Sequence, residues 1–472
     1  MPSVCRSSVF EHAPEHARKR APASCAVADE LLGLEGLRLL AFDRLAPSVD
    51  AEHPRGLLRL TIQTDPPAIV ACHRCGVLTA DHGRREHRLA DAPAFGTPVQ
   101  LIWRKRRWRC REPRCPAGAW SEEHPALPVR AKLTARAVAW ATQTLRWDDS
   151  TVSALARQLG VDWHTLMKAI RAHAADNLDG EPARGARLAG VDTLGVDEHI
   201  WRPSARHRDR AVTSIVDLTR DKHGQVHARL LDVTLGRSGP VYATWIRQQT
   251  RQFVASITHA SLDPFRGYAN AIRTELPDDT VTVLDAFHIV KLASTAMDEV
   301  RRRVQQDALG RRGHRDDPLY RIRRLLTTAR ENLTDRGRAR LEAALQAGDP
   351  NLEVTVAWHA YQDLRSMFHA STPPVGRAVA ERVLNSFHRC PIPEIARLGR
   401  TLRSWRAEVL AYFNDDLRRH GISNGGTEAI NLIIEKTRRL AHGFRNFTNY
   451  RIRILLAADG TRPWRHRRRR SG

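Results

Sequence analysis

Val191-Asp-Thr-Leu-Gly-Val-Asp-Glu-His199 predicts a buried strand, the first of the α/β part of this chain. Apolar residues lead into it, and Asp197 and Glu198 stand where a buried strand would reach the surface. Because side chains alternate along a strand, Glu198 should point away from Asp197. Carboxylates at such a position are either solvated or hold a metal ion. We expect Asp197 to be the first ligand of a metal-dependent nuclease or strand-transfer site.

Basic residues greatly outnumber acidic residues. The 472 residues include 76 Lys+Arg against 52 Asp+Glu, a net charge of +24. Such an excess favours a polyanionic partner, most simply nucleic acid. Codon bias in a GC-rich genome would explain arginine in place of lysine, but not the shortage of acids. We see neither the apolar core of a signal peptide nor a membrane-spanning apolar run, so we expect a cytoplasmic, nucleoid-associated protein with no membrane contact.

Four of the seven cysteines form two local pairs, Cys72-His-Arg-Cys75 and Cys110-Arg-Glu-Pro-Arg-Cys115. Each pair is short enough to turn two thiolates toward one point, and four thiolates suit a tetrahedral structural Zn²⁺. We therefore expect residues 33–125 to form a zinc-binding ribbon with one zinc ion. Three nearby histidines could replace a thiolate: His73, His82 and His87.

Between the cysteine pairs, the run from Val99 to Arg109 alternates aromatic and basic residues as a strand would. In a zinc ribbon such a strand could lie along DNA phosphates. The alternative is a solvated basic edge strand, which resists aggregation. Beside a metal site we favour nucleic-acid contact, through four residues: Arg104, Lys105, Arg106 and Arg107.

Residues 126–180 turn helical and contain a candidate helix-turn-helix from Val152 to Ile170. Gly160 fits the tight turn, and Asp162 is placed to cap the second helix. An ordinary helical hairpin is the alternative, and the basic charge and the cysteine pairs favour DNA reading. The second helix would present four side chains to a major groove: Trp163, His164, Thr165 and Lys168.

From residue 188 the pattern changes to strands and helices of a multidomain α/β protein. Three strands, a helix, a strand over 253–263, a helix and a strand follow in turn, which is the order of a ribonuclease H-like domain. Many α/β folds begin similarly. The remaining segments are a disordered tail (1–32), the first part of the catalytic domain (188–291), a helical insertion (292–420), the last catalytic helix (421–456) and a basic tail (457–472).

Three carboxylates should converge in such a sheet. Asp197 and Asp263 would lie side by side, because the first strand neighbours the strand after the first crossover. Glu428, in the first turn of the last long helix, can supply the third acid. A set of this kind can hold two divalent cations about 3.5–4 Å apart. Asp285 also ends a strand and is the rival second acid, and Glu435 shares a helical face with Glu428.

Three motifs make the sequence recognisable: Leu194-Gly-Val-Asp-Glu198, Asp285-Ala-Phe-His-Ile-Val-Lys291 and Asn424-Gly-Gly-Thr-Glu-Ala-Ile-Asn431, the last followed by a conspicuous block from Arg438 to Leu456. Together they closely resemble a bacterial DDE transposase of the ISL-three family of insertion sequences. The four paired cysteines are similar to the zinc finger of this family, and the run from His87 to Gly96 looks like its linker. The resemblance covers nearly the whole chain.

The resemblance implies cleavage of double-stranded DNA at the inverted-repeat ends of the element, then attack of the freed 3′-hydroxyl on target DNA. It implies a DDE triad of Asp197, Asp263 and Glu428 with two Mg²⁺ (or Mn²⁺) ions, and makes Asp285 and His288 an accessory or alternative pair. Pairing two transposon ends usually takes two protomers, so we expect a homodimer or a larger assembly. The alternative function is a catalytically silent DNA-binding protein, either a domesticated transposase or a regulator.

Overall fold

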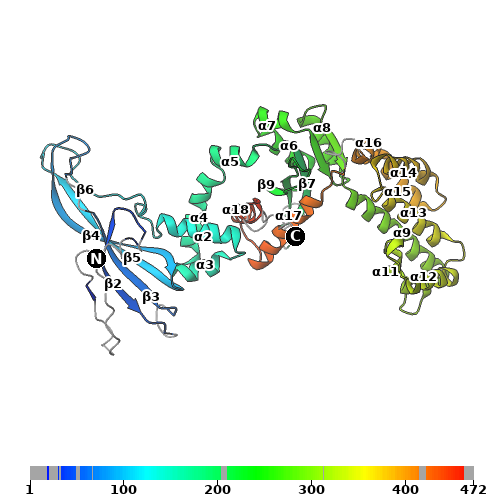
Figure 1. Ribbon diagram of the computed structural model, residues 1–472, viewed down its shortest axis with the longest axis horizontal. Helices are drawn as coiled ribbons and strands as arrows, with labels where there is room; N and C mark the ends of the chain where they lie inside the picture. The colour runs from blue at the N-terminus through cyan, green and yellow to red at the C-terminus, as the bar shows by residue number, and fades with distance from the viewer. Residues whose placement is uncertain are drawn as a thin grey trace. The chain divides into compact units, whose positions relative to one another are not determined.

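The chain divides into two compact units, residues 1–183 and 184–472, and each is described by itself (Figure 1). Most of the two predicted tails lies outside the described residues. None of the described helices combines the length and the apolar character needed to cross a bilayer. The computed structural model describes residues 33–48, 54–65, 69–203, 210–311, 313–413 and 421–461, together with Lys19–Arg20, Glu30 and Pro67.

A six-stranded sheet forms the first part of unit 1. Its order is β1-β2-β3-β5-β4, with β6 paired to β5. The apolar core of this sheet includes Ile62, Leu101 and Trp103, which are all fully buried. The strands are β1 (Lys19–Arg20), β2 (Leu37–Leu45), β3 (Leu57–Thr64), β4 (Thr79–Ala94), β5 (Thr97–Cys110) and β6 (Ala119–Ser121).

The predicted basic strand exists as β5, but it is not an edge strand. It pairs in parallel with β3 on one side and antiparallel with β4 on the other, so the edge-strand alternative is wrong. The run from His87 to Gly96 is not a linker either. It forms the second half of β4 and the turn into β5, where Phe95 and Gly96 both have positive φ.

Four helices follow in unit 1, and two of them form the predicted helix pair. Gly160 ends α3 with φ 66° in the left-handed region, and Asp162 caps α4 by accepting the N–H of Thr165, so the predicted turn and cap are confirmed. Leu166 and Ile170 are fully buried. The helices are α2 (Ala135–Trp147), α3 (Val152–Leu159), α4 (Trp163–Asn177) and α5 (Glu181–Leu188), the last of which spans the boundary of the units.

Unit 2 contains a five-stranded sheet of order β11-β10-β7-β8-β9. The first three strands in sequence form an antiparallel meander, and the last two lie parallel to β7. A parallel neighbour requires a crossover connection, and helices supply it here. The strands are β7 (Thr193–Ile200), β8 (Ala211–Asp217), β9 (Arg229–Leu235), β10 (His259–Leu262) and β11 (Val281–Leu284).

The strand predicted over residues 253–263 is wrong in its first half. Thr250 accepts the N–H of Phe253 and starts a short helix, so the chain stays helical to Ser256 and β10 begins only at His259. The crossover therefore contains α6 (Gly239–Arg247) and α7 (Arg251–Ser256). A second crossover, α8 (Arg266–Glu275), joins β10 to β11.

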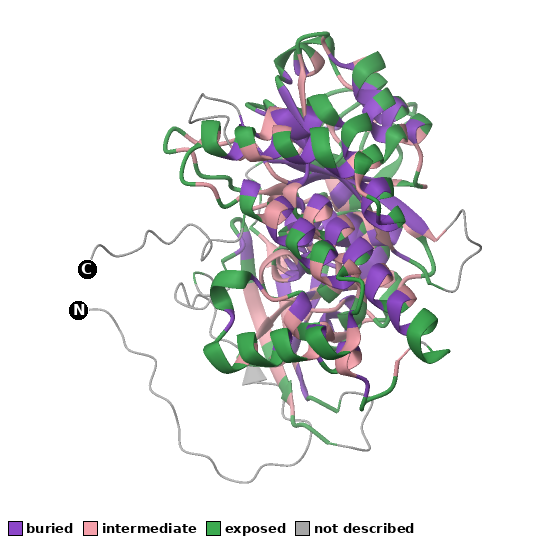
Figure 2. Ribbon diagram, turned by 90° about the vertical axis from the view of Figure 1, so that its right-hand side faces the viewer, coloured by how far each residue is buried: buried purple, intermediate pink, exposed green. Residues whose placement is uncertain are grey.

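Residues after β11 are helical, as predicted, before the chain returns to the sheet. One apolar cluster runs from sheet residues such as Leu194 to helical residues such as Leu402 and Phe413, so sheet and insertion share a core. Figure 2 shows buried residues along helices as well as strands. The returning helix α17 packs on β7 and β8. The helices are α9 (Ala286–Leu309), α10 (Pro318–Arg321), α11 (Arg323–Leu326), α12 (Asp335–Gly348), α13 (Glu353–Met367), α14 (Pro373–Ser386), α15 (Pro393–Ser404), α16 (Arg406–Leu410), α17 (Gly425–Leu440) and α18 (Phe447–Ala458).

Gly195 allows α17 to approach β7. A Cβ at this position would overlap Thr427 Oγ1 and lie 2.7 Å from Leu218 Cδ1. We predict that Gly195→Ala destabilises unit 2 by about 1–3 kcal/mol, because overpacking forces the helix from the sheet. Thermal denaturation followed by circular dichroism measures the loss. Gly185→Ala is the matched control: its Cβ meets nothing within 4 Å in α5, so it should not lower the melting temperature. Equal melting of the two variants would contradict the prediction.

Candidate active site

Three aspartates lie at one level across three parallel strands. Leu262 of β10 is in register with Val196 of β7 and with Leu284 of β11. The residue that follows each of these three in the sequence is an aspartate: Asp197, Asp263 and Asp285. Neighbouring strands are about 4.8 Å apart, so the three carboxylates meet at one edge of the sheet.

Asp197 is nearly buried, with 8% of its surface exposed. One carboxylate oxygen accepts the N–H of Glu198 at 2.6 Å, and the other accepts Nδ2 of Asn431 at 2.6 Å. Burial, and then the negative charge of Asp263, raise the pKa of Asp197 to about 7. Glu198 instead pairs with Arg237. Asp197 is thus a carboxyl group whose ionised form needs a cation beside it.

His288 lies between the other two aspartates. Its Nδ1 is 2.9 Å from Asp263 Oδ1 and 2.9 Å from Asp285 Oδ2. Burial alone would lower the pKa of His288, but hydrogen bonds to the two carboxylates, and their charges, raise the pKa to about 10. The ligand atoms of these three residues all lie within 4.8 Å of one another, a spacing that fits a metal ion. His288 therefore lies between the two acids at the position where the three side chains could hold a cation.

The two aspartates beside His288 differ in how far their oxygens are engaged. Asp285 is 1% exposed; its Oδ1 accepts the backbone N–H of Asn424 at 2.7 Å, and its Oδ2 accepts the N–H of His288 at 3.1 Å. Asp285 also caps α9. Asp263 has 18% of its side chain exposed. Asp263 is therefore the more available metal ligand of the two.

Two asparagines of α17 tie this helix to the acids. Asn424 is fully buried, and its Nδ2 donates to Val196 O at 3.2 Å and to Asp263 Oδ1 at 3.3 Å. Seven residues later, Asn431 donates to Asp197 and accepts a hydrogen bond from Ser214. Asn424 is the N-cap residue of α17, but its side chain makes no cap bond and is directed to these partners instead. The spacing of seven residues, one face of a helix, was the signal for this pair.

Glu428 lies between those asparagines in the first turn of α17 and is partly exposed. Burial, and then the negative charge of Asp285, raise the pKa of Glu428. Its rival Glu435 is held by Arg438 at 2.7 Å and by Arg439 at 2.5 Å. The hydrogen bond from Arg438 is the main reason that the pKa of Glu435 falls to about 2. Of these two acids, Glu428 is therefore the one that interacts electrostatically with the aspartates.

The four predicted zinc ligands converge in unit 1. Cys72 Sγ is 3.8 Å from Cys115 Sγ, and Cys75 Sγ is 3.5 Å from Cys110 Sγ. Tetrahedral zinc with bonds of about 2.3 Å separates its sulfur ligands by about 3.8 Å, so this arrangement fits the ion. Of the three nearby histidines, His73 packs on Trp120, His87 bonds the carbonyl of Ala131, and His82 is exposed.

The residues predicted to contact DNA differ in how far their side chains are exposed to solvent. Arg104 is exposed, whereas Arg106 is buried and donates to the carbonyls of Thr64 and Asp65. The Lys105 ammonium lies 4.8 Å from the centre of the Trp103 ring, and the side chain is nearly buried. The rest are Arg107 and Thr165, which are half-buried, and Trp163, His164 and Lys168, which are exposed.

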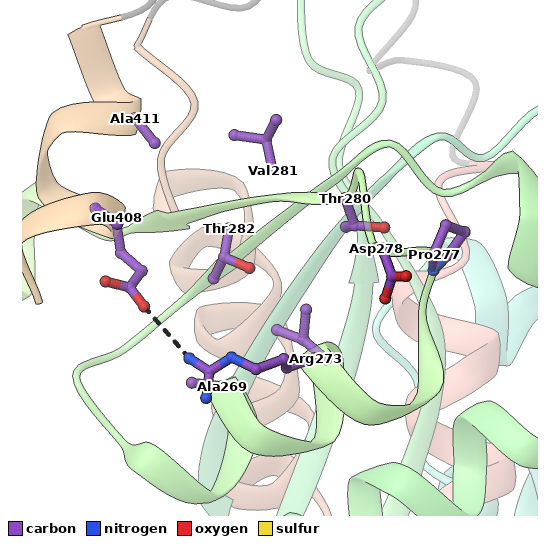
Figure 3. Close-up of a pocket in the computed structure, with 11 residues that line it drawn as sticks. Ala269, Arg273, Pro277, Asp278, Thr280, Val281, Thr282, Glu408 and Ala411 are labelled. Atoms are coloured by element: carbon purple, nitrogen blue, oxygen red, sulfur yellow. Dashed lines mark ion pairs between the residues drawn. The ribbon is translucent and has the colours of Figure 1, made fainter.

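A pocket of about 350 Å³ lies between α8, β11 and α16 (Figure 3). Arg273 and Glu408 face each other across it at 3.9 Å. Its lining includes Asp278 but none of the converging acids described above. This pocket is therefore separate from the carboxylate group.

Comparison with known proteins agrees with this arrangement. Residues 194–454 match the DDE_Tnp_ISL3 family, described as a transposase, and residues 69–115 match the zinc finger of the transposases of IS204, IS1001, IS1096 and IS1165. The chain is 25% identical to the transposase for insertion sequence element IS1001 of Bordetella parapertussis over 411 residues. This aligned region covers 85% of the chain and 92% of the relative. It is 27% identical over 365 residues to the transposase for insertion sequence element IS1557 of Mycobacterium tuberculosis, or 70% of this chain and 76% of the relative.

Proposed function

Because the chain belongs to the ISL3 family of insertion-sequence transposases, we propose that it cuts DNA at the terminal inverted repeats of its own element and transfers the freed strand to target DNA. The observation that carries this proposal is the shared level of Asp197, Asp263 and Asp285 at one sheet edge, with Glu428 brought to the same edge by α17. The strand order β11-β10-β7-β8-β9 supports a ribonuclease H-like class for this domain.

In this proposal Asp197, Asp263 and Glu428 form the DDE triad and would hold two Mg²⁺ (or Mn²⁺) ions. Bound there, divalent ions would activate the attacking oxygen and stabilise the leaving 3′-oxygen. Asp197 would hold a divalent ion together with Asp263, since it stands beside Asp263 and is oriented by Asn431. Asp285 orients His288 and the start of α17.

For DNA recognition we propose that the zinc-stabilised sheet and the α3–α4 pair of unit 1 bind the terminal repeats. The exposed Trp163, His164 and Lys168 at the start of α4 support this role, because recognition helices use their first residues on base edges. A homodimer or larger assembly would pair the two ends of the element.

The proposal is tested with end-labelled duplex carrying an end of the element, incubated with protein and Mg²⁺ or Mn²⁺. Asp263→Cys should lose cleavage with Mg²⁺ and recover part of it with Mn²⁺, because thiolate is a poor Mg²⁺ ligand. Asp285→Cys should show no such rescue if Asp285 only positions its neighbours. Duplex binding without metal-dependent cleavage by the wild type would reject the enzyme and leave the silent DNA-binding protein.

Divalent metal should also stabilise unit 2, because it neutralises clustered carboxylates. A cation at about 100 times its Kd adds about 2.7 kcal/mol, or roughly 5 °C in melting temperature for a unit of this size. Differential scanning fluorimetry with and without Mg²⁺ measures the shift. Asp263→Asn should abolish it, whereas Glu435→Gln, which changes an acid already paired with arginines, should retain it. A shift that survives Asp263→Asn would place the cation elsewhere.

A further inference from the structure

A groove of about 750 Å³ in unit 1 runs between α4 and residues 128–133, the segment that leads into α2. Its floor is largely apolar and includes Leu133 and Val138. Its charged lining consists of three exposed cations, Arg130, Lys132 and Lys168, and one exposed acid, Asp176. Lys168 belongs to the exposed face of α4 proposed to read DNA, so the groove continues that face.

The segment beside α4 is fixed to the sheet rather than loose. The carbonyl of Ala131 accepts Nε2 of His87 at 2.8 Å, and the carbonyl of Lys132 accepts the N–H of Ala90 at 2.8 Å. Both partners lie on β4. The N–H of Ala131 closes a turn by donating to the carbonyl of Pro128 at 3.1 Å. The cations of this segment are therefore held at a set place beside the helix.

Arg130 occupies a conformation that favours glycine. Its φ is 60°, in the left-handed region, which is strained for a residue with a Cβ. Its side chain is exposed and makes no hydrogen bond or ion pair with any residue that the structure describes. The surrounding structure holds this conformation in place, and such conformations are common at ligand-binding sites. The guanidinium of Arg130 is therefore available to a partner outside the chain.

We propose that this groove holds the sugar–phosphate backbone of one DNA strand, with Arg130, Lys132 and Lys168 on its phosphates. The proposal rests on the DNA-binding role proposed for α3 and α4, and it adds the segment before α2 as a second wall. A recognition helix enters the major groove by its first turns, so an element beside those turns meets the flanking backbone. The apolar floor suits deoxyribose, and the three cations suit the phosphates.

The test is the salt dependence of binding to a linear duplex of arbitrary sequence, measured with the full-length protein without Mg²⁺. Phosphate contacts do not depend on sequence, and each lost contact lowers the slope of log K against log salt by about 0.9. We expect Arg130→Gly and Lys132→Gln each to lower the slope by about that amount. Arg130→Gly should melt at or above the wild-type temperature, because glycine accepts this φ.

Arg340→Gln is the matched control, since Arg340 is exposed on α12 of unit 2 and does not line the groove; its slope should equal the wild-type slope. Wild-type slopes for Arg130→Gly and Lys132→Gln would overturn the groove assignment alone. A changed oligomeric mass with an unchanged slope would assign the groove to a second copy and also overturn it. Failure of the wild type to bind duplex would overturn both this proposal and the DNA-binding role.

Discussion

Asp197→Asn should reduce metal-dependent cleavage of element-end DNA by about 10³-fold or more. A metal ion at a transferring phosphoryl group contributes several kcal/mol, and each 1.36 kcal/mol is tenfold in rate. Asparagine keeps the size of the side chain but not the charge that the proposed triad needs. Single-turnover cleavage of labelled duplex in Mg²⁺ measures the loss.

Two further measurements separate lost chemistry from lost structure. Binding of Asp197→Asn to the same duplex without Mg²⁺ should match the wild type, because the proposed DNA-binding surfaces lie in unit 1. Asp192→Asn is the matched control on the same stretch: Asp192 is exposed and bonds the hydroxyl of its neighbour Thr193. Cleavage at a wild-type rate by Asp197→Asn would refute the triad.

Cys110→Ser should remove the zinc ion from unit 1 and open one end of its sheet. Binding of structural zinc is worth on the order of 10 kcal/mol in zinc-finger peptides. Cys110 ends β5, and its thiol faces the Cys72–Cys75 loop that precedes β4, so the metal would bind the two segments together. The apolar cluster around Leu89 and Leu101 lies further along these strands and should stay folded.

Zinc content by mass spectrometry should fall from one ion per chain to nearly none in Cys110→Ser. Hydrogen exchange should rise around residues 69–85 and 106–121 and stay low around Leu101. Cys390→Ser is the control, because Cys390 packs against the core of unit 2 and should leave the zinc content unchanged. Full zinc content in Cys110→Ser would exclude the four-cysteine site.

Local patterns were enough to predict the elements that depend on neighbours in sequence. Gly160 and Asp162 determine a turn and a cap within a few residues, and both are confirmed. Asp263 and Asp285 were placed at strand ends from apolar runs alone and do follow β10 and β11 directly, whereas β7 continues beyond Asp197 to Ile200. The helix that begins at Thr250 was missed because residues 253–257 are rich in apolar and β-branched side chains, which suit a buried strand equally well.

Contacts between distant residues could not be predicted in this way. Asn424 bonds residues 139 and 161 positions away, and Asn431 bonds Asp197 across 234 positions. The seven-residue spacing places Asn424 and Asn431 on one helix face, but it does not specify which distant residues they bond. The burial of Arg106 has the same origin, because its carbonyl acceptors lie on β3 and just after it, brought alongside β5 by parallel pairing. The position of Glu428 in the first turn of a helix made it only a candidate for the third acid. The resemblance to a transposase family was needed to prefer it.

The place of α17 in the chain has a consequence for protein synthesis. Ribosomes release the sheet and the helical insertion first, and Glu428 follows only after the 139 residues that separate Asp285 from Asn424. A nascent or prematurely ended chain that stops before residue 424 lacks the third acid of the proposed triad. It also lacks the helix whose asparagines hydrogen-bond to the aspartates. Such a product still contains all of unit 1. On the proposed function, such a product could bind the ends of the element but could not cut them. An unfinished chain would therefore cause no DNA breaks.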